Sequence, residues 1–195
     1  MIKLINILKE ITEGKQIGDI YHFTSTDALG SMIEEFSNIT LDVAEGSFAA
    51  GGYYSFTRNP NLGTLAEEKH HVRIKLNGDK MSTRYKFEPY ADQANGEDFL
   101  KGGSHFESEE RINSKGKPIN LTPFIEEITI LSPEKFQEYL DDYHKGSENS
   151  KYYKEIVRLY NVSLDWIKSS GIPYKLIGKR TTAGIRKSER TSQNK

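Results

Sequence analysis

The amino-acid sequence predicts an α+β fold, in which helices flank a β-sheet. Residues 71–76 (HVRIKL) alternate polar and apolar side chains, which is typical of a half-buried strand. Residues 151–169 predict a long helix, because their apolar residues fit one face of a helix, although only loosely. The chain of 195 residues is long enough to bury a sizeable core as one domain.

The first elements are predicted from apolar spacing and helix caps. Residues 1–14 have apolar side chains at helical spacing and indicate an amphipathic helix. Residues 17–24 are rich in strand-forming residues and indicate a strand. Ser25 or Thr26 can then cap a helix that runs to about Glu35.

The middle of the chain is predicted to alternate strands and loops. Two apolar runs, 39–43 and 53–56, are separated by the small-residue stretch 45–52. That stretch can be a mobile loop or a close approach of the backbone to a ligand. Residues 81–90 resemble an extended connector, and 91–104 a polar loop.

The last elements follow a turn that Asn77-Gly-Asp79 indicates. Residues 118–130 contain a short strand, and Ser132 followed by Pro133 is typical of a helix start. Residues 171–177 indicate a final strand.

The chain is expected to form one domain, residues 15–177, with a segment at each end. Residues 178–195 contain six basic residues and a single acid, Glu189, which predicts a flexible tail. Such a tail is either an inert terminus or a contact for nucleic acid or an acidic surface.

Composition excludes several classes of function. Basic and acidic residues nearly balance, 27 against 28, so the whole chain is not an electrostatic nucleic-acid binder. No cysteine is present, which excludes disulfides and thiolate metal sites. His70 and His71 would lie on opposite faces of a strand, so no metal site is expected. No apolar stretch approaches the roughly 18 residues of a membrane-spanning helix, and we expect a soluble, cytoplasmic protein without a membrane contact.

Three short polar motifs stand in strand-like sequence, at residues 21–24 (YHFT), 53–58 (YYSFTR) and 106–112 (FESEERI). Each has an ordinary explanation when it is taken alone. Strand histidines are commonly hydrogen-bonded, aromatic residues favour sheets, and an acidic cluster can be a solvated turn. If the strands that carry the motifs pair, the motifs converge on one site.

The third motif crowds three glutamates, Glu107, Glu109 and Glu110. Crowded carboxylates raise one another's pKa unless water or a bound group offsets the repulsion. In an extended segment Glu107 and Glu109 share one face and Glu110 lies on the other. At most two of the three can therefore line a single cleft.

In their order, these motifs resemble the ADP-ribosyltransferase superfamily, one branch of which carries His, Tyr and Glu and another Arg, Ser-Thr-Ser and Glu-x-Glu. The segment Ile20-Tyr-His-Phe-Thr24, with Ala28, Leu29 and Ile33 after it, is similar to the first motif of DarT-like toxins and of tRNA 2′-phosphotransferases. The resemblance spans residues 19 to 130. It implies an ADP-ribosyltransferase-like, split antiparallel or mixed β-sheet core with flanking helices.

The resemblance also implies residues that bind NAD as a substrate. His22 matches the histidine that hydrogen-bonds the ribose of the adenosine half, and Tyr53 or Tyr54 would stack on nicotinamide. Ser55-Phe-Thr57 is similar to the Ser-Thr-Ser strand of the other branch, and Arg58 is the candidate for binding pyrophosphate. The full set of expected cofactor-binding residues is His22, Thr24, Tyr53, Tyr54, Ser55 and Arg58.

The catalytic glutamate is expected among the crowded three. Ser108-Glu109 matches an Ala-Glu pair of DarT-like proteins, so Glu109 is preferred. Glu107 would be the earlier member of a Glu-x-Glu pair, and Glu110 is the fallback.

The implied function is that of a toxin-like glycosyltransferase, an ADP-ribosyltransferase that uses NAD to modify nucleic acid or protein. The first helix and the basic tail resemble phage-encoded proteins in general style, which places the protein in host cytoplasm or a virion. One alternative is a non-catalytic structural or interaction protein, such as a virion component, that retains the fold. Another is an NAD-dependent RNA 2′-phosphotransferase, although the basic residues that grip phosphate in that family have no clear counterpart here.

Overall fold

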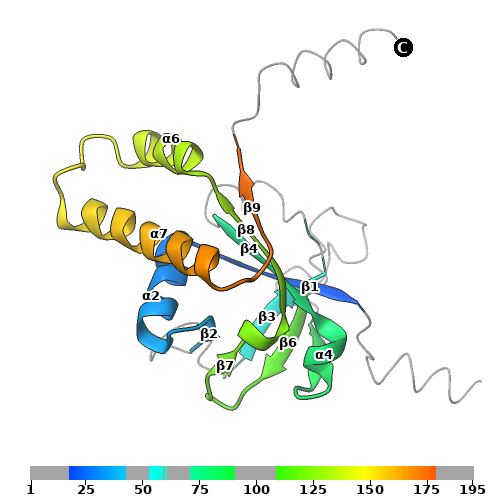
Figure 1. Cartoon of the computed structure of the whole chain (residues 1–195). Helices are drawn as coiled ribbons and strands as arrows, with labels where there is room; N and C mark the ends of the chain where they lie inside the picture. Colours follow the sequence, from blue (N-terminus) through cyan, green and yellow to red (C-terminus); the bar gives the residue numbers. More distant parts are fainter. Residues whose placement is uncertain (1–17, 43–52, 59, 61–70, 91–108, 179–195) are drawn as a thin grey trace, which may run out of the picture.

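The computed structural model describes residues 18–42, 53–58, 60, 71–90 and 109–178, and the fold is α+β, as the sequence predicts (Figure 1). A mixed sheet of seven strands forms its centre. Across this sheet the order is β5 (Phe87–Tyr90), β6 (Glu109–Asn113), β3 (Tyr53–Thr57), β1 (Asp19–Thr24), β4 (Val72–Asn77), β8 (Ile125–Leu131) and β9 (Tyr174–Ile177). Neighbouring strands pair antiparallel except β8 and β9, which are parallel.

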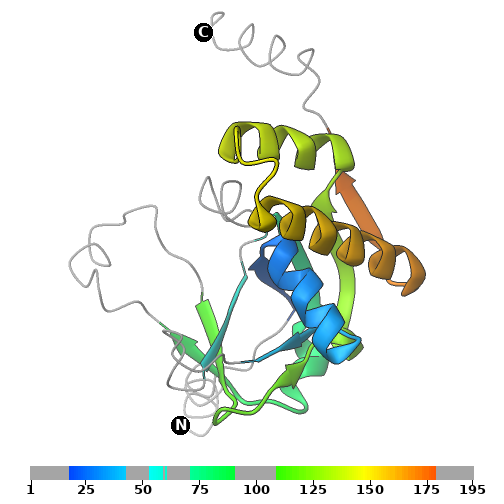
Figure 2. The same ribbon diagram turned by 90° about the vertical axis from the view of Figure 1, so that its left-hand side faces the viewer.

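Helices and a smaller sheet surround this centre. The helices are α2 (Thr26–Phe36), α4 (Gly78–Ser82), α6 (Pro133–Tyr143) and α7 (Lys151–Ser169), with a 3-10 helix, η2 (Thr122–Phe124). The smaller sheet pairs β2 (Thr40–Leu41) with β7 (Ile119–Asn120). Figure 2 shows α2 lying against α7. None of the helices in the described ranges combines the length and apolar character needed to cross a membrane.

Serine side chains cap three of the helices. Ser25 accepts a hydrogen bond from the amide of Ala28, which makes it the cap of α2 and leaves Thr26 as the first helical residue. Ser132 caps α6 in the same way, with Pro133 at the first helical position as expected. Ser150 caps α7.

The segment from Asn77 to Tyr90 differs from the expected turn and extended connector. Asn77 caps the short helix α4, because its Oδ1 accepts from the amide of Lys80 at 2.8 Å. Gly78 donates its amide to the carbonyl of Gly18 at 3.1 Å, and a Cβ at Gly78 would lie 2.5 Å from that oxygen. Part of the expected connector then forms strand β5.

One face of the large sheet forms the core and is called the core face. It includes Ile20, Ile74 and Ile128, all fully buried. Each such side chain contributes roughly 1.5–3 kcal/mol through burial. The helices complete the core with Leu29, Ile33, Phe136, Leu140, Ile156, Tyr160, Leu164 and Ile167.

The opposite face of β1, β4 and β8 is called the charged face. The Nζ of Lys75 lies 2.8 Å from Asp19 and 3.0 Å from Glu126. Arg73 donates to the Oγ1 of Thr129 at 3.0 Å. In β4 the buried and partly exposed positions alternate along the strand, as the sequence predicts.

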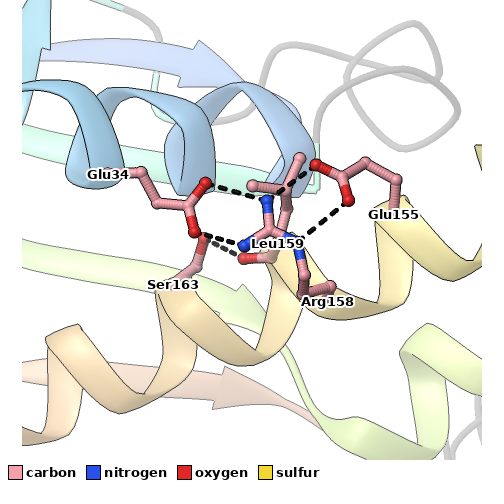
Figure 3. Close-up of polar contacts among 5 residues, drawn as sticks. All are labelled: Glu34, Glu155, Arg158, Leu159 and Ser163. Atoms are coloured by element: carbon pink, nitrogen blue, oxygen red, sulfur yellow. Dashed lines mark hydrogen bonds and ion pairs between the residues drawn. The ribbon is translucent and has the colours of Figure 1, made fainter.

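Helices α2 and α7 approach each other closely at Gly30. A Cβ on Gly30 would lie 2.5 Å from the carbonyl oxygen of Leu159 and 2.8 Å from the Cβ of Leu159. The hydroxyl of Ser163, one turn further along α7, lies 2.9 Å from the same carbonyl (Figure 3). It also lies 3.0 Å from the carbonyl of Thr26. A glycine is therefore what lets the two helix backbones meet.

An arginine joins these helices at the edge of their contact. Arg158 of α7 donates to both carboxylate oxygens of Glu34 on α2, and it also donates to Glu155 at 2.7 and 2.9 Å (Figure 3). These hydrogen bonds lower the pKa of Glu34 and the pKa of Glu155 from the ordinary value of 4.5. All three side chains are exposed, so the contribution to stability is small.

Replacing this arginine is expected to change how stability depends on acid. A carboxylate whose pKa is lowered in the folded chain stabilises the fold above its ordinary pKa, and this contribution disappears as the pH falls through the folded pKa. As the pH falls from about 5 to about 2, the free energy of unfolding should therefore decrease less for the Arg158→Ala variant than for the wild type. Thermal unfolding across this range, with Lys154→Ala on the same helix as the control, measures the difference. Identical profiles for wild type and Arg158→Ala would contradict the expectation.

Several predicted segments lie outside the described residues. They are the helix over residues 1–14, the small-residue stretch 45–52, the polar loop 91–104, the glutamate Glu107, and the basic tail beyond Gly178.

Candidate functional site

The strands that carry the three motifs are neighbours in the large sheet. Strand β3, with residues 53–57, lies between β1, which carries His22, and β6, which begins at Glu109. Segments that are far apart in the sequence are thus brought together by antiparallel pairing. The three strands that carry the motifs are therefore adjacent, which is the pairing that a common site requires.

The sheet opens between β1 and β3. Tyr21 opposite Thr57 is the pair that joins these two strands, whereas β1 and β4 pair along the whole of β1, from Asp19 to Thr24. Beyond that pair, the Nδ1 of His22 lies 3.4 Å from the backbone carbonyl of Ser55.

His22 is half-buried at this opening. Because a carbonyl oxygen only accepts, the contact with Ser55 requires the proton to be on Nδ1. The other nitrogen, Nε2, is then the acceptor of the neutral ring. The imidazole also packs against Phe56, with ring centroids 5.8 Å apart.

The pairing register places Glu110 on the same face as His22. Glu110 lies opposite Phe56, and the Phe56 ring contacts His22. His22 in turn lies opposite the buried Ile74, so the row belongs to the core face. Glu110 and His22 therefore lie on the two strands that flank β3.

The register places Glu109 on the other face. Glu109 lies opposite Thr57, which lies opposite Tyr21, and this row continues to Lys75 on the charged face. Since neighbouring strand residues alternate, Tyr53 and Ser55 belong to this face too. The expected residues are therefore divided between the two faces of one sheet, and Glu109 does not share a face with His22.

Tyr54 and Thr24 are on the core face with His22, and both are buried. The Tyr54 hydroxyl donates to the carbonyl of Lys117 at 3.4 Å, so the residue is anchored in the core. Arg58 directly follows β3 and is exposed.

The sequence prediction did not include Phe56, which the structure places at the centre of the row. Its side chain is almost fully buried, and its ring lies between His22 and Phe87, with a centroid distance of 6.0 Å to the latter. The signal was present, because an apolar residue between Ser55 and Thr57 marks the buried face of a strand.

His71 does not belong to this row of residues. The ring of His71 is buried against Tyr139, with centroids 4.0 Å apart. In the described parts of the chain, no group of three or more histidine, aspartate or glutamate residues is placed to hold a metal ion. The row across β1, β3 and β6 is the arrangement that fits the sequence motifs.

Comparisons with protein-family models, with curated proteins and with solved structures found no match to this chain.

Proposed function

We propose that this chain is an NAD-dependent ADP-ribosyltransferase that modifies a macromolecular target, either nucleic acid or protein, in the cytoplasm. The observation that carries the proposal is the adjacency of β6, β3 and β1, which puts the three motifs side by side. The opening of the sheet between β1 and β3 supports an ADP-ribosyltransferase-like split sheet.

In this proposal the core face supplies the reacting groups. Cleaving the bond between nicotinamide and ribose passes through a cation-like sugar centre, as glycoside hydrolysis does. A carboxylate beside that centre stabilises the charge and can accept a proton from the incoming nucleophile. Glu110 takes this role, because its backbone position shares a row with His22.

His22 holds the substrate in the same proposal. With Nδ1 donating to the Ser55 carbonyl, the neutral ring would offer Nε2 as an acceptor to a ribose hydroxyl. The dinucleotide would extend across β3, from His22 on β1 to Glu110 on β6. Arg58, exposed at the end of β3, would pair with pyrophosphate oxygens in this proposal.

The test compares two adjacent glutamates as a matched pair. Wild type, Glu110→Gln and Glu109→Gln are each incubated with labelled NAD and cell extract, and nicotinamide release without extract is measured in parallel. Glu110→Gln should lose activity by about 100-fold or more, since it removes the charge beside the reacting carbon. Glu109→Gln should retain most of the activity, because its backbone position is on the charged face.

Release of nicotinamide is included because it needs no acceptor. Wild-type protein that neither releases nicotinamide nor binds NAD would contradict the proposal. Loss of activity in Glu109→Gln with normal activity in Glu110→Gln would move the reaction to the charged face.

A further inference from the structure

Strand β9 ends the large sheet, with β8 on one side (Figure 1). No strand in the described ranges pairs with its other side. All four of its side chains are exposed, and three are large and apolar: Tyr174 at 41%, Leu176 at 44% and Ile177 at 44%. Exposed apolar strand edges of this kind are templates for the addition of another strand.

The backbone hydrogen bonds between β8 and β9 identify which groups of β9 face outward. The amide of Ile128 donates to the carbonyl of Pro173, and the amide of Ser132 to the carbonyl of Ile177, both at 3.0 Å. Successive residues of a strand direct their backbone groups to opposite sides. The N–H and C=O groups of Tyr174 and Leu176 therefore face the outer edge.

We propose that β9 pairs antiparallel with the β9 of a second copy of this chain, about a two-fold axis at Leu176. Such pairing satisfies the outward N–H and C=O groups of both strands and makes one sheet continuous through two copies. In a two-fold dimer both copies contribute the same surface, so the edge of β9 has to be complementary to itself.

The charges of β9 select the register. If the axis passed through Lys175, two lysines would lie directly opposite each other, which destabilises a strand pair. With the axis at Leu176, this leucine lies opposite its own copy, and Lys175 lies opposite the partner's Ile177. Tyr174 then lies opposite the partner's Gly178, around which no atom would contact an added Cβ within 4 Å.

Lys175 does not protect this edge in the way that an edge lysine commonly does. Its Nζ lies 2.7 Å from the carboxylate of Glu127 on β8. The pair reduces the net charge that a second strand would meet.

Single cysteines test both the pairing and its register, because the chain has no cysteine of its own. In the proposed register the two copies of residue 176 form a hydrogen-bonded pair with Cα atoms about 5.5 Å apart. That distance is within the range of about 4.4–6.8 Å for disulfides. Copies of residue 175 lie on a diagonal, at roughly 7–8 Å. Mild oxidation should thus crosslink Leu176→Cys efficiently and Lys175→Cys poorly.

The mass of the full chain in solution, from light scattering, is the second measurement. Wild type should have twice the 22.2 kDa of one chain. Leu176→Pro should be monomeric, since proline removes an outward N–H and leaves the bonds to β8 in place. Tyr152→Ala, which removes an exposed aromatic ring from α7, should remain dimeric.

Three results would overturn the proposal: a monomeric wild type, a dimer that survives Leu176→Pro, or equal crosslinking of the two cysteine variants. If the wild type is monomeric, protection of its β9 amides from hydrogen exchange would show that another part of the same chain covers the edge.

Discussion

Gly30→Ala is expected to lower the free energy of unfolding, by about 1–3 kcal/mol, although alanine is the better helix former. In an exposed helix interior the same change would stabilise by up to about 1 kcal/mol. Here the added methyl would lie 2.5 Å from the carbonyl oxygen of Leu159, and that oxygen belongs to the backbone of α7. Two helices would have to separate, so the packing cost exceeds the gain in propensity.

Ser31→Ala is the matched control for this change. Ser31 is the next residue on α2 and is exposed, so its replacement gains helix propensity without a new contact. Chemical denaturation of the two variants should shift the midpoint down for Gly30→Ala and leave it level or higher for Ser31→Ala. A higher midpoint for Gly30→Ala would show that α2 and α7 do not approach each other as described.

Phe56→Ala is expected to cost more, about 3–5 kcal/mol, through lost burial and a cavity beneath the site. The side chain is 2% exposed and packs between His22 and Phe87. Domains of this kind are stable by only about 5–15 kcal/mol, so much of the total would be lost.

Phe56→Leu separates packing from the loss of the ring. It keeps most of the buried volume and should cost clearly less than Phe56→Ala in the same denaturation experiment. A cost below about 1 kcal/mol for Phe56→Ala would mean that the ring is not a central part of the core.

Elements with local signals were predicted well from the sequence. Strand β4 follows from the alternation in residues 71–76, and the start of α6 from Ser132 and Pro133. These signals act within a few residues, so no distant contact is needed to interpret them.

Strand β5 and helix α4 show where local signals mislead. Pro89 argues against a strand, yet β5 lies at the edge of the sheet, where a missing N–H is tolerated. The Asn-Gly-Asp sequence before it is typical of a turn, but asparagine is also a helix cap, and here it caps α4.

The division of the candidate site between two faces depends on the strand register, which the motifs alone do not reveal. The alternation of Glu109 and Glu110 was predictable, but their faces follow from the pairing of Glu110 with Phe56. A slip of one residue would exchange the two glutamates. The adjacency of β1, β3 and β6 likewise results from long-range pairing that no single segment encodes.

The proposed binding of NAD beside His22, at the opening between β1 and β3, can be tested directly. The most direct measurement is a titration of histidine-labelled protein with NAD, followed through the imidazole nitrogen resonances and assigned with His22→Gln. The His22 resonances should shift in the wild type and in Glu110→Gln, while those of His144, at the end of α6, should stay in place. A titration that leaves His22 unchanged, or shifts His144 as much as His22, would contradict the claim.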